Sequence, residues 1–95
     1  MVIGKETGGM SWVYILKSEE KDKYYIGSAA DPEKRLLEHN SGRNKFTRPF
    51  RPWKIVFKQE YCSLKCARGV EIRLKRYKSR KIIEQIIKDG HILGH

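Results

Sequence analysis

Five side chains whose chemistry suits phosphodiester hydrolysis are spaced along this sequence. They are two phenols, one guanidinium, one imidazole and one carboxylate, contributed by Tyr14, Tyr25, Arg35, His39 and Glu71. Hydrolysis of a phosphodiester needs an activated water, stabilisation of the charge that develops around phosphorus, and help for the leaving oxygen. Magnesium accepts one protein carboxylate and several waters as ligands, so a single acid can hold it. The set therefore raises single-metal hydrolysis as a hypothesis.

The charged members of this set each have an ordinary alternative role. Arg35 and His39 stand four residues apart, so on a helix they share one face. The arginine can grip phosphate oxygens, while the histidine can accept a proton, bond to a phosphate oxygen or simply lie on the surface. Glu71 falls at the edge of an apolar helical stripe and could hold a metal or pair with Arg68 or Lys75. On the residues alone, the ion pair is the more ordinary role.

The two tyrosines lie in segments that are typical of neighbouring strands. Ser11 to Lys17 and Tyr24 to Ser28 are rich in aromatic and β-branched residues and flank a charged turn, which predicts an antiparallel hairpin. If Tyr14 and Tyr25 are neighbours across this hairpin, both hydroxyls can point at one phosphate. The alternative is that both rings are core residues whose hydroxyls reach the surface.

A helix and a basic loop are predicted after the hairpin. Asp31 is a favourable N-cap with a proline next to it, and the helix should continue to about Asn40. Its contacts with the core are expected from Leu36 and Leu37. Residues 43–52 are rich in arginine and broken by two prolines, so they are expected to lack regular structure.

A third strand and two more helices complete the chain. Trp53 to Tyr61 is a predicted strand, Ser63 caps a helix through about Arg76, and Ser79 caps a last helix that Gly90 ends. The inward stripes are expected to be Leu64, Ala67, Val70, Leu74 and Tyr77, then Ile82, Ile83, Ile86 and Ile87. The order ββαβαα predicts an α/β (α+β) fold in which helices flank a three-stranded antiparallel sheet.

Length and charge restrict the class of protein. The 95 residues suffice for a single domain, expected at 11–90 between a flexible leader (1–10) and a short tail (91–95). A net charge of +10 favours nucleic acid or an anionic membrane surface as partner. No apolar run approaches the ~20 residues of a membrane span, and no signal segment is present, so a cytoplasmic location is expected. Cys62 and Cys66 are too few for a zinc site and are expected to be reduced thiols.

These motifs, in this order and spacing, resemble the GIY-YIG endonuclease family, in particular its small stand-alone bacterial domains. The first motif is Trp12-Val13-Tyr14, with tryptophan in place of the glycine, and the second is Tyr25-Ile26-Gly27, eleven residues after Tyr14. Arg35 and His39 match the family's helical arginine and the histidine one turn later. Glu71 matches its metal-binding glutamate. The resemblance covers residues 12 to about 88.

The resemblance implies roles for the five residues. Glu71 would bind Mg²⁺ or another divalent cation. Tyr14 would position or deprotonate the attacking water, and Tyr25 would orient the phosphate that Arg35 and His39 grip. Because a free phenol has a pKa near 10, deprotonation would need cations or the metal to lower the pKa of Tyr14, and Arg35 is the obvious helper.

The loop after the first helix also resembles the stand-alone members, in Asn40-Ser41-Gly42, Thr47 and Pro52-Trp53. Sequence-independent contacts with the DNA backbone are expected from Arg43, Lys45, Thr47, Arg48 and Arg51. Gly27 is expected to allow close approach of the substrate. The chain departs from the family beyond Glu71, where Ile83 and Gln85 occupy the region of a frequent asparagine.

The sequence therefore favours a metal-dependent DNA endonuclease, structure-sensitive or weakly sequence-specific, that acts in DNA repair or recombination. Its partner would be DNA, branched or single-stranded, with no membrane and no small-molecule cofactor, and a monomer is favoured over a dimer. The alternative is a nucleic-acid-binding module that keeps the fold with little or no catalysis. A third hypothesis is a protein-interaction adaptor that uses an exposed, isoleucine-rich C-terminal helix.

Overall fold

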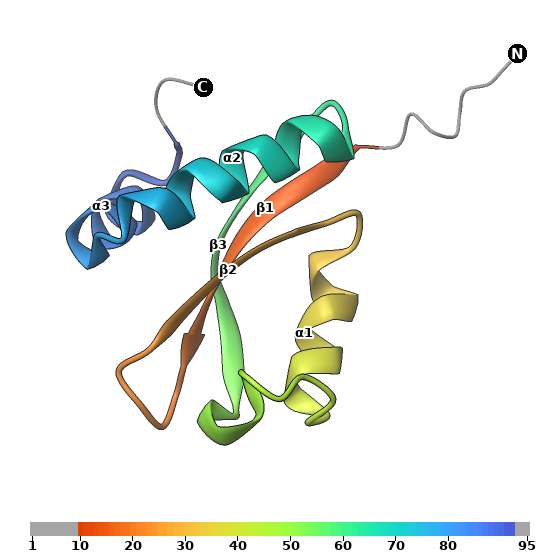
Figure 1. The fold of residues 1–95 in the computed structure, drawn as a ribbon, viewed down its shortest axis with the longest axis vertical. Helices are drawn as coiled ribbons and strands as arrows, with labels where there is room; N and C mark the ends of the chain where they lie inside the picture. Colours follow the sequence, from red (N-terminus) through yellow and green to blue (C-terminus); the bar gives the residue numbers. More distant parts are fainter. Residues whose placement is uncertain (1–9, 93–95) are drawn as a thin grey trace, which may run out of the picture.

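The fold was obtained as a computed structural model that describes residues 10–92. Over this range a three-stranded antiparallel sheet of order β2-β1-β3 carries three α-helices, which confirms the expected fold class (Figure 1). The elements are β1 (Ser11–Ser18), β2 (Tyr24–Ala29), α1 (Pro32–Asn40), the 3-10 turn η2 (Arg48–Phe50), β3 (Trp53–Tyr61), α2 (Leu64–Tyr77) and α3 (Arg80–Asp89). Except for Met10, the expected leader lies outside the described residues. None of the described helices has the length and apolar content that a bilayer crossing requires.

The central strand β1 is buried on both faces. Val13, Tyr14, Ile15 and Leu16 are each no more than 1% exposed. Because side chains alternate across a strand, the odd-numbered pair joins the core beneath α2 and α3, and the even-numbered pair joins a second core with Trp53. The sheet is therefore covered by α2 and α3 on one face, and by α1 with the loop before β3 on the other (Figure 1).

The helices begin where their caps predict. Each starts after a side chain that accepts a backbone N–H: Asp31 from Lys34, Ser63 from Cys66 and Ser79 from Ile82. Each bond satisfies one of the N–H groups that a helix start leaves without an intrahelical partner. α3 ends at Gly90, whose φ of 81° is the left-handed conformation that glycine readily adopts.

The first helix buries different side chains from those expected. Leu37 is 70% exposed and contributes nothing to the core, whereas Leu36 packs against it. The buried residues of α1 are Pro32 and His39. The buried stripe runs through positions 32, 36 and 39, which is a helical i, i+4, i+7 pattern, and Leu37 lies outside it. The loop after α1 is also more regular than expected, because it contains the turn η2.

The other two helices also bury narrower stripes than expected. In α2, Leu64 and Tyr77 at the two ends are 42% and 49% exposed, while the central Ala67, Val70 and Leu74 are buried. These three are spaced i, i+3 and i+7, so they form the apolar stripe that faces the sheet. The terminal residues extend past the edge of the core.

The last helix is not an exposed apolar surface. Ile83, Ile86 and Ile87 of this helix pack in the core, whereas Ile82 is 37% exposed. Ile92 belongs to the same core with 8% exposure, so the folded unit extends beyond the boundary expected at residue 90. This packing buries most of the apolar face on which the adaptor hypothesis depends.

Gly27 is required by the ring of Tyr14. The two residues are direct partners across β1 and β2. A Cβ at Gly27 would lie 2.5 Å from Tyr14 Cζ, closer than real side chains approach. The Tyr14 phenol therefore fills the space that a side chain at Gly27 would need, and Gly27 also lines a hollow together with Tyr14 and Glu71.

Gly27→Ala should lower the free energy of unfolding by about 1–3 kcal/mol, a typical cost of overpacking, because the new Cβ would overlap the buried Tyr14 ring. Gly69→Ala is the matched control: it lies within α2, and a Cβ there would meet nothing within 4 Å. It should raise the free energy of unfolding by about 0.5–1 kcal/mol. Urea denaturation followed by circular dichroism measures both. Equal effects of the two substitutions would contradict the packing argument.

Candidate functional site

The five candidate residues line two adjoining hollows beside β2. The larger, the Glu71 hollow, measures about 400 Å³ and is lined by Tyr14, Tyr25, Arg35 and Glu71 among others. The smaller, the His39 hollow, measures about 240 Å³ and is lined by His39 together with the same Tyr25 and Arg35. Residues from β1, β2, α1 and α2 thus meet around one shared wall, made of Tyr25 and Arg35.

The position of β2 explains this meeting. β2 is an edge strand, and α1 and α2 cover opposite faces of the sheet. Both helices can therefore reach the free side of β2, where Arg35 from α1 and Glu71 from α2 line the same hollow. Ser28 of β2 makes the link to α2, because its hydroxyl donates a hydrogen bond to Glu71 Oε1.

Tyr14 is a deeply buried phenol. Its side chain is 1% exposed, and its ring centroid lies 6.5 Å from that of Tyr25. Burial, together with smaller effects of Tyr25 and Glu71, raises the pKa of Tyr14 to about 12, although Arg35 opposes the increase through its charge and a hydrogen bond. The help expected from Arg35 is present, but burial outweighs it. Tyr14 is therefore a neutral hydrogen-bonding group in this state.

His39 is buried between Tyr25 and Thr47. It is 3% exposed, its ring centroid lies 4.7 Å from that of Tyr25, and its Nδ1 lies 2.9 Å from Thr47 Oγ1. Burial lowers the pKa of His39, and the charge of Arg35 lowers it further against a smaller opposing effect of Glu38. His39 is thus a neutral imidazole whose orientation is fixed by Thr47.

The loop between α1 and β3 places Thr47 behind His39. Asn40 closes the loop, because its Oδ1 accepts from the Trp53 N–H at 2.6 Å and its Nδ2 donates to the Trp53 carbonyl at 3.0 Å. The Trp53 indole then donates to the Thr47 carbonyl at 2.8 Å. Thr47 was expected to contact DNA, but it is only 2% exposed. Its side chain positions His39 and does not face a ligand.

Glu71 is held by two partners. Its side chain is 17% exposed, Oε1 accepts from Ser28, and Oε2 lies 2.7 Å from Lys75 Nζ. The ammonium of Lys75 also lies 5.5 Å from the Tyr25 ring centroid. The ion pair considered as the alternative role of Glu71 therefore exists, with Lys75 as the partner. Its place in the Glu71 hollow leaves room for a metal role as well.

The donor set around Glu71 fits a hard divalent cation bound mainly by water. Among the described residues no group of three or more His, Cys, Asp or Glu side chains could hold a metal ion. Glu71 would thus be the one carboxylate ligand, in a hollow large enough for several waters. Oε2 would have to exchange Lys75 for the cation, and Lys75 is 47% exposed and free to move aside.

The basic loop residues lie in three different settings. Arg43 lines the His39 hollow. Arg48 and Arg51 are exposed but fold back onto the loop, with Arg48 donating to the Gly42 carbonyl at 3.4 Å and Arg51 Nε to the Arg48 carbonyl at 3.0 Å. Lys45 is exposed. Of the cations expected to contact DNA, Arg43 is therefore the one next to the candidate catalytic residues.

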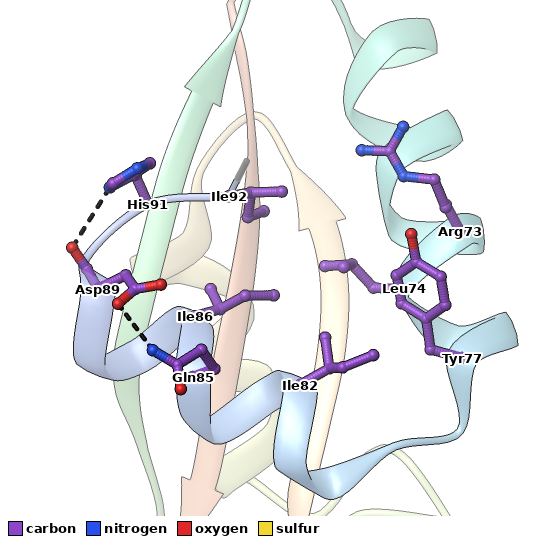
Figure 2. Close-up of a pocket in the computed structure, with 9 residues that line it drawn as sticks. All are labelled: Arg73, Leu74, Tyr77, Ile82, Gln85, Ile86, Asp89, His91 and Ile92. Carbon is purple, nitrogen blue, oxygen red and sulfur yellow. Dashed lines mark hydrogen bonds between the residues drawn. The ribbon is translucent and has the colours of Figure 1, made fainter. Parts of the chain in front are cut away.

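A separate apolar hollow of about 250 Å³ lies between α2, α3 and the chain after Gly90 (Figure 2). Its lining includes Leu74, Ile82, Ile86 and Ile92 and none of the five candidate residues. Gln85, in the region of the family's late asparagine, borders this hollow and donates to Asp89 Oδ1 at 2.9 Å (Figure 2). Gln85 therefore does not line the Glu71 hollow.

Sequence reasoning overlooked Ser28 and left Asn40 without a role in the site. Ser28 follows Gly27 in β2, so strand alternation directs its side chain to the α2 face, opposite to the Tyr14 phenol. That alternation was a usable signal. The side chain of Asn40 forms hydrogen bonds with the backbone of Trp53, thirteen positions further along the chain, and no local pattern in the sequence predicts such a contact.

The fold and this grouping of side chains are those expected of a small nuclease domain. The model of the GIY-YIG catalytic domain matches residues 10–84, and the chain therefore belongs to the GIY-YIG family.

Two bacterial relatives are similar to this chain over most of its length. A UPF0213 protein of Syntrophus aciditrophicus is 39% identical over 82 residues, which are 84% of this chain and 92% of that protein. A UPF0213 protein of Streptococcus pneumoniae is 38% identical over 69 residues, 72% of this chain and 69% of that protein. The structure-specific endonuclease subunit SLX1 of Scheffersomyces stipitis is 43% identical over 51 residues, 46% of this chain but 15% of that protein. No solved structure is significantly similar to the chain.

The lowered pKa of His39 should make stability depend on pH. Below about pH 6.5, the ordinary pKa of histidine, the unfolded chain binds a proton that the folded chain resists. The free energy of unfolding should therefore decrease as the pH falls from this value through the lower folded pKa. His39→Gln should reduce this slope, whatever it does to overall stability. Thermal unfolding between about pH 8 and about pH 5 measures both slopes, and identical slopes would contradict the burial of a neutral His39.

Proposed function

We propose that this protein is a metal-dependent DNA endonuclease, structure-sensitive or weakly sequence-specific, that acts in DNA repair or recombination. The observation that supports the proposal most is the meeting of Tyr14, Tyr25, Arg35 and Glu71 around one hollow, with His39 in the adjoining one. Membership of a family of nuclease catalytic domains supports the reaction class. The net charge of +10 suits a polyanionic substrate.

The residues of the hollow divide the work of hydrolysis among them. Glu71 would hold the divalent cation, which supplies positive charge to the phosphoryl oxygens and assists the leaving oxygen when bound. Arg35 is exposed enough for its guanidinium to grip a phosphate that enters the shared wall. Neutral His39 can accept or donate one hydrogen bond there, since its Nδ1 is already committed to Thr47.

The two tyrosines differ in what they can do. Tyr14, with a pKa of about 12, is a phenol at neutral pH and would position the attacking water by hydrogen bonding. It becomes a base only when additional positive charge arrives to offset its burial. Tyr25, which lies between Tyr14 and His39, would orient the phosphate between the two hollows.

We expect the protein to distinguish DNA structures and not base sequences, because the basic residues of the site are suited to the phosphate backbone. The basic residues around the hollows are suited to phosphate contacts, which carry no sequence information. The similarity to a protein named as a structure-specific endonuclease subunit points in the same direction. Branched or single-stranded DNA is therefore the preferred substrate in this proposal.

Cleavage assays on duplex, single-stranded and branched DNA with magnesium test the proposal. The wild-type protein should nick or cut the branched or single-stranded DNA, and chelator, Glu71→Gln or Arg35→Ala should each abolish cutting. Tyr14→Phe should slow it by about 10²-fold or more, because the water loses its positioning group.

The matched control is Glu60→Gln, which makes the same chemical change at an exposed carboxylate of β3 and should leave cutting intact. If Glu71→Gln cuts as fast as Glu60→Gln, the activity belongs to a contaminant or to other residues, and the proposal fails.

Lys75 should compete with the metal for Glu71. Lys75→Met removes the ammonium bonded to Oε2. Because partly exposed ion pairs contribute up to about 1 kcal/mol, manganese binding should tighten by up to about fivefold. Calorimetric titration with manganese in the absence of DNA measures this, and Glu71→Gln should remove the binding. Weaker binding by Lys75→Met would mean that the lysine supports the metal site.

The second candidate function is nucleic-acid binding without catalysis. Two observations favour it. Lys75 forms an ion pair with the carboxylate of Glu71, and burial keeps the phenol of Tyr14 protonated. It predicts salt-dependent DNA binding that survives Glu71→Gln and needs no metal. The cleavage assays separate the two candidates.

A further inference from the structure

We propose that a basic groove, which shares Tyr25 with the His39 hollow, binds the DNA backbone next to the phosphate that is cut. The groove measures about 440 Å³ and lies between the β1–β2 turn and the connection from α2 to α3. Both segments lie on the same side of the molecule, at the left of Figure 1. The inference rests on the proposed function, and names the path that the substrate follows.

The groove is lined by four cations and one acid. The cations are Lys23, Lys75, Lys78 and Arg80, and the acid is Asp22. Asp22 forms an ion pair with Arg80, which neutralises one cation and leaves an excess of positive charge. A concave surface with several cations suits phosphates, and the aromatic ring of Tyr25 is available to the sugar or base between them.

Tyr25 connects this groove to the candidate catalytic residues. It lines the groove, the Glu71 hollow and the His39 hollow alike. Lys75 makes a second connection, because it lines the groove and contacts Glu71 Oε2. The three hollows are therefore linked at Tyr25, with Arg43 and Arg35 in the His39 hollow and Lys78 in the groove. A DNA strand along the three hollows would have its backbone held on both sides of the phosphate in the Glu71 hollow.

Lys78 is the residue that a purely structural account does not explain. It follows the last residue of α2 with φ 47° and ψ 36°, a left-handed conformation at a position where glycine is usual. The side chain of lysine is unfavourable in this conformation, so folding alone gives no reason for a lysine at this position. Among the described residues its ammonium forms no hydrogen bond or ion pair. It is therefore available to a phosphate.

The test compares DNA binding and stability in the same variants. Lys78→Gly and the double variant Lys23→Ala/Lys78→Gly are measured against wild type by fluorescence anisotropy, with labelled single-stranded and branched DNA in the presence of chelator. The single variant should bind DNA at least about threefold more weakly, and the double variant about tenfold more weakly. The slope of the logarithm of the binding constant against the logarithm of the salt concentration should decrease in magnitude by about 0.7–0.9 per lost phosphate contact. The melting temperature of Lys78→Gly should stay equal or rise, because glycine suits the left-handed position.

Lys88→Ala is the charge-matched control, an exposed lysine of α3 outside the groove. Lys78→Asn, which also tolerates the left-handed conformation, repeats the test with a different side chain. If Lys78→Gly and Lys78→Asn bind as tightly as Lys88→Ala, the groove proposal is wrong while the proposed function stands. If the wild-type protein binds no DNA, both are wrong. Weaker binding with an unchanged or higher melting temperature supports the groove.

Discussion

The candidate site depends on the packing of the Tyr14 ring over Gly27. These residues are partners across β1 and β2, and only a residue without a Cβ leaves space for the ring. The contact places the Tyr14 phenol beside Tyr25 and within reach of Arg35, at the edge strand where α1 and α2 meet. A side chain at position 27 would displace the ring, and the distance from Tyr14 to the other candidate residues would change with it. The glycine of the motif Tyr25-Ile26-Gly27 is therefore required for the position of the tyrosine in the motif Trp12-Val13-Tyr14.

Burial and the charge of Arg35 together determine the pKa values of Tyr14 and His39. Arg35 lowers the pKa of both Tyr14 and His39. At His39 burial acts in the same direction, so the imidazole stays neutral. At Tyr14 burial acts in the opposite direction and is stronger, so the phenol also stays neutral. A protein with a net charge of +10 thus keeps two neutral hydrogen-bonding groups beside the point where a phosphate would bind, and Glu71 with Lys75 supplies a balanced pair.

Most helices and strands could be predicted from the sequence because the signals that start and end them are local. The caps at Asp31, Ser63 and Ser79 and the ending at Gly90 depend on a few neighbouring residues, and each element formed where such signals stood. The gathering of the five candidate residues was suggested by the family resemblance and not by periodicity. What local patterns could not give was burial: Leu37 is exposed, and Thr47 is inside the protein. The burial of Thr47 depends on how the loop after α1 folds against β3, which no short segment encodes.

The two halves of the site are supported by different kinds of interaction. The half that carries Tyr14 and Glu71 rests on the central strand and on α2, whose inner residues belong to the larger apolar core. The half that carries His39 rests on polar bonds, from Asn40 to the Trp53 backbone and from Trp53 to the Thr47 carbonyl. A buried apolar side chain loses only part of its many weak contacts when one neighbour is shortened, whereas the loss of one hydrogen-bonding partner leaves a buried polar group unpaired. The position of His39 is therefore the more sensitive part of the site, and the position of Glu71 the more robust.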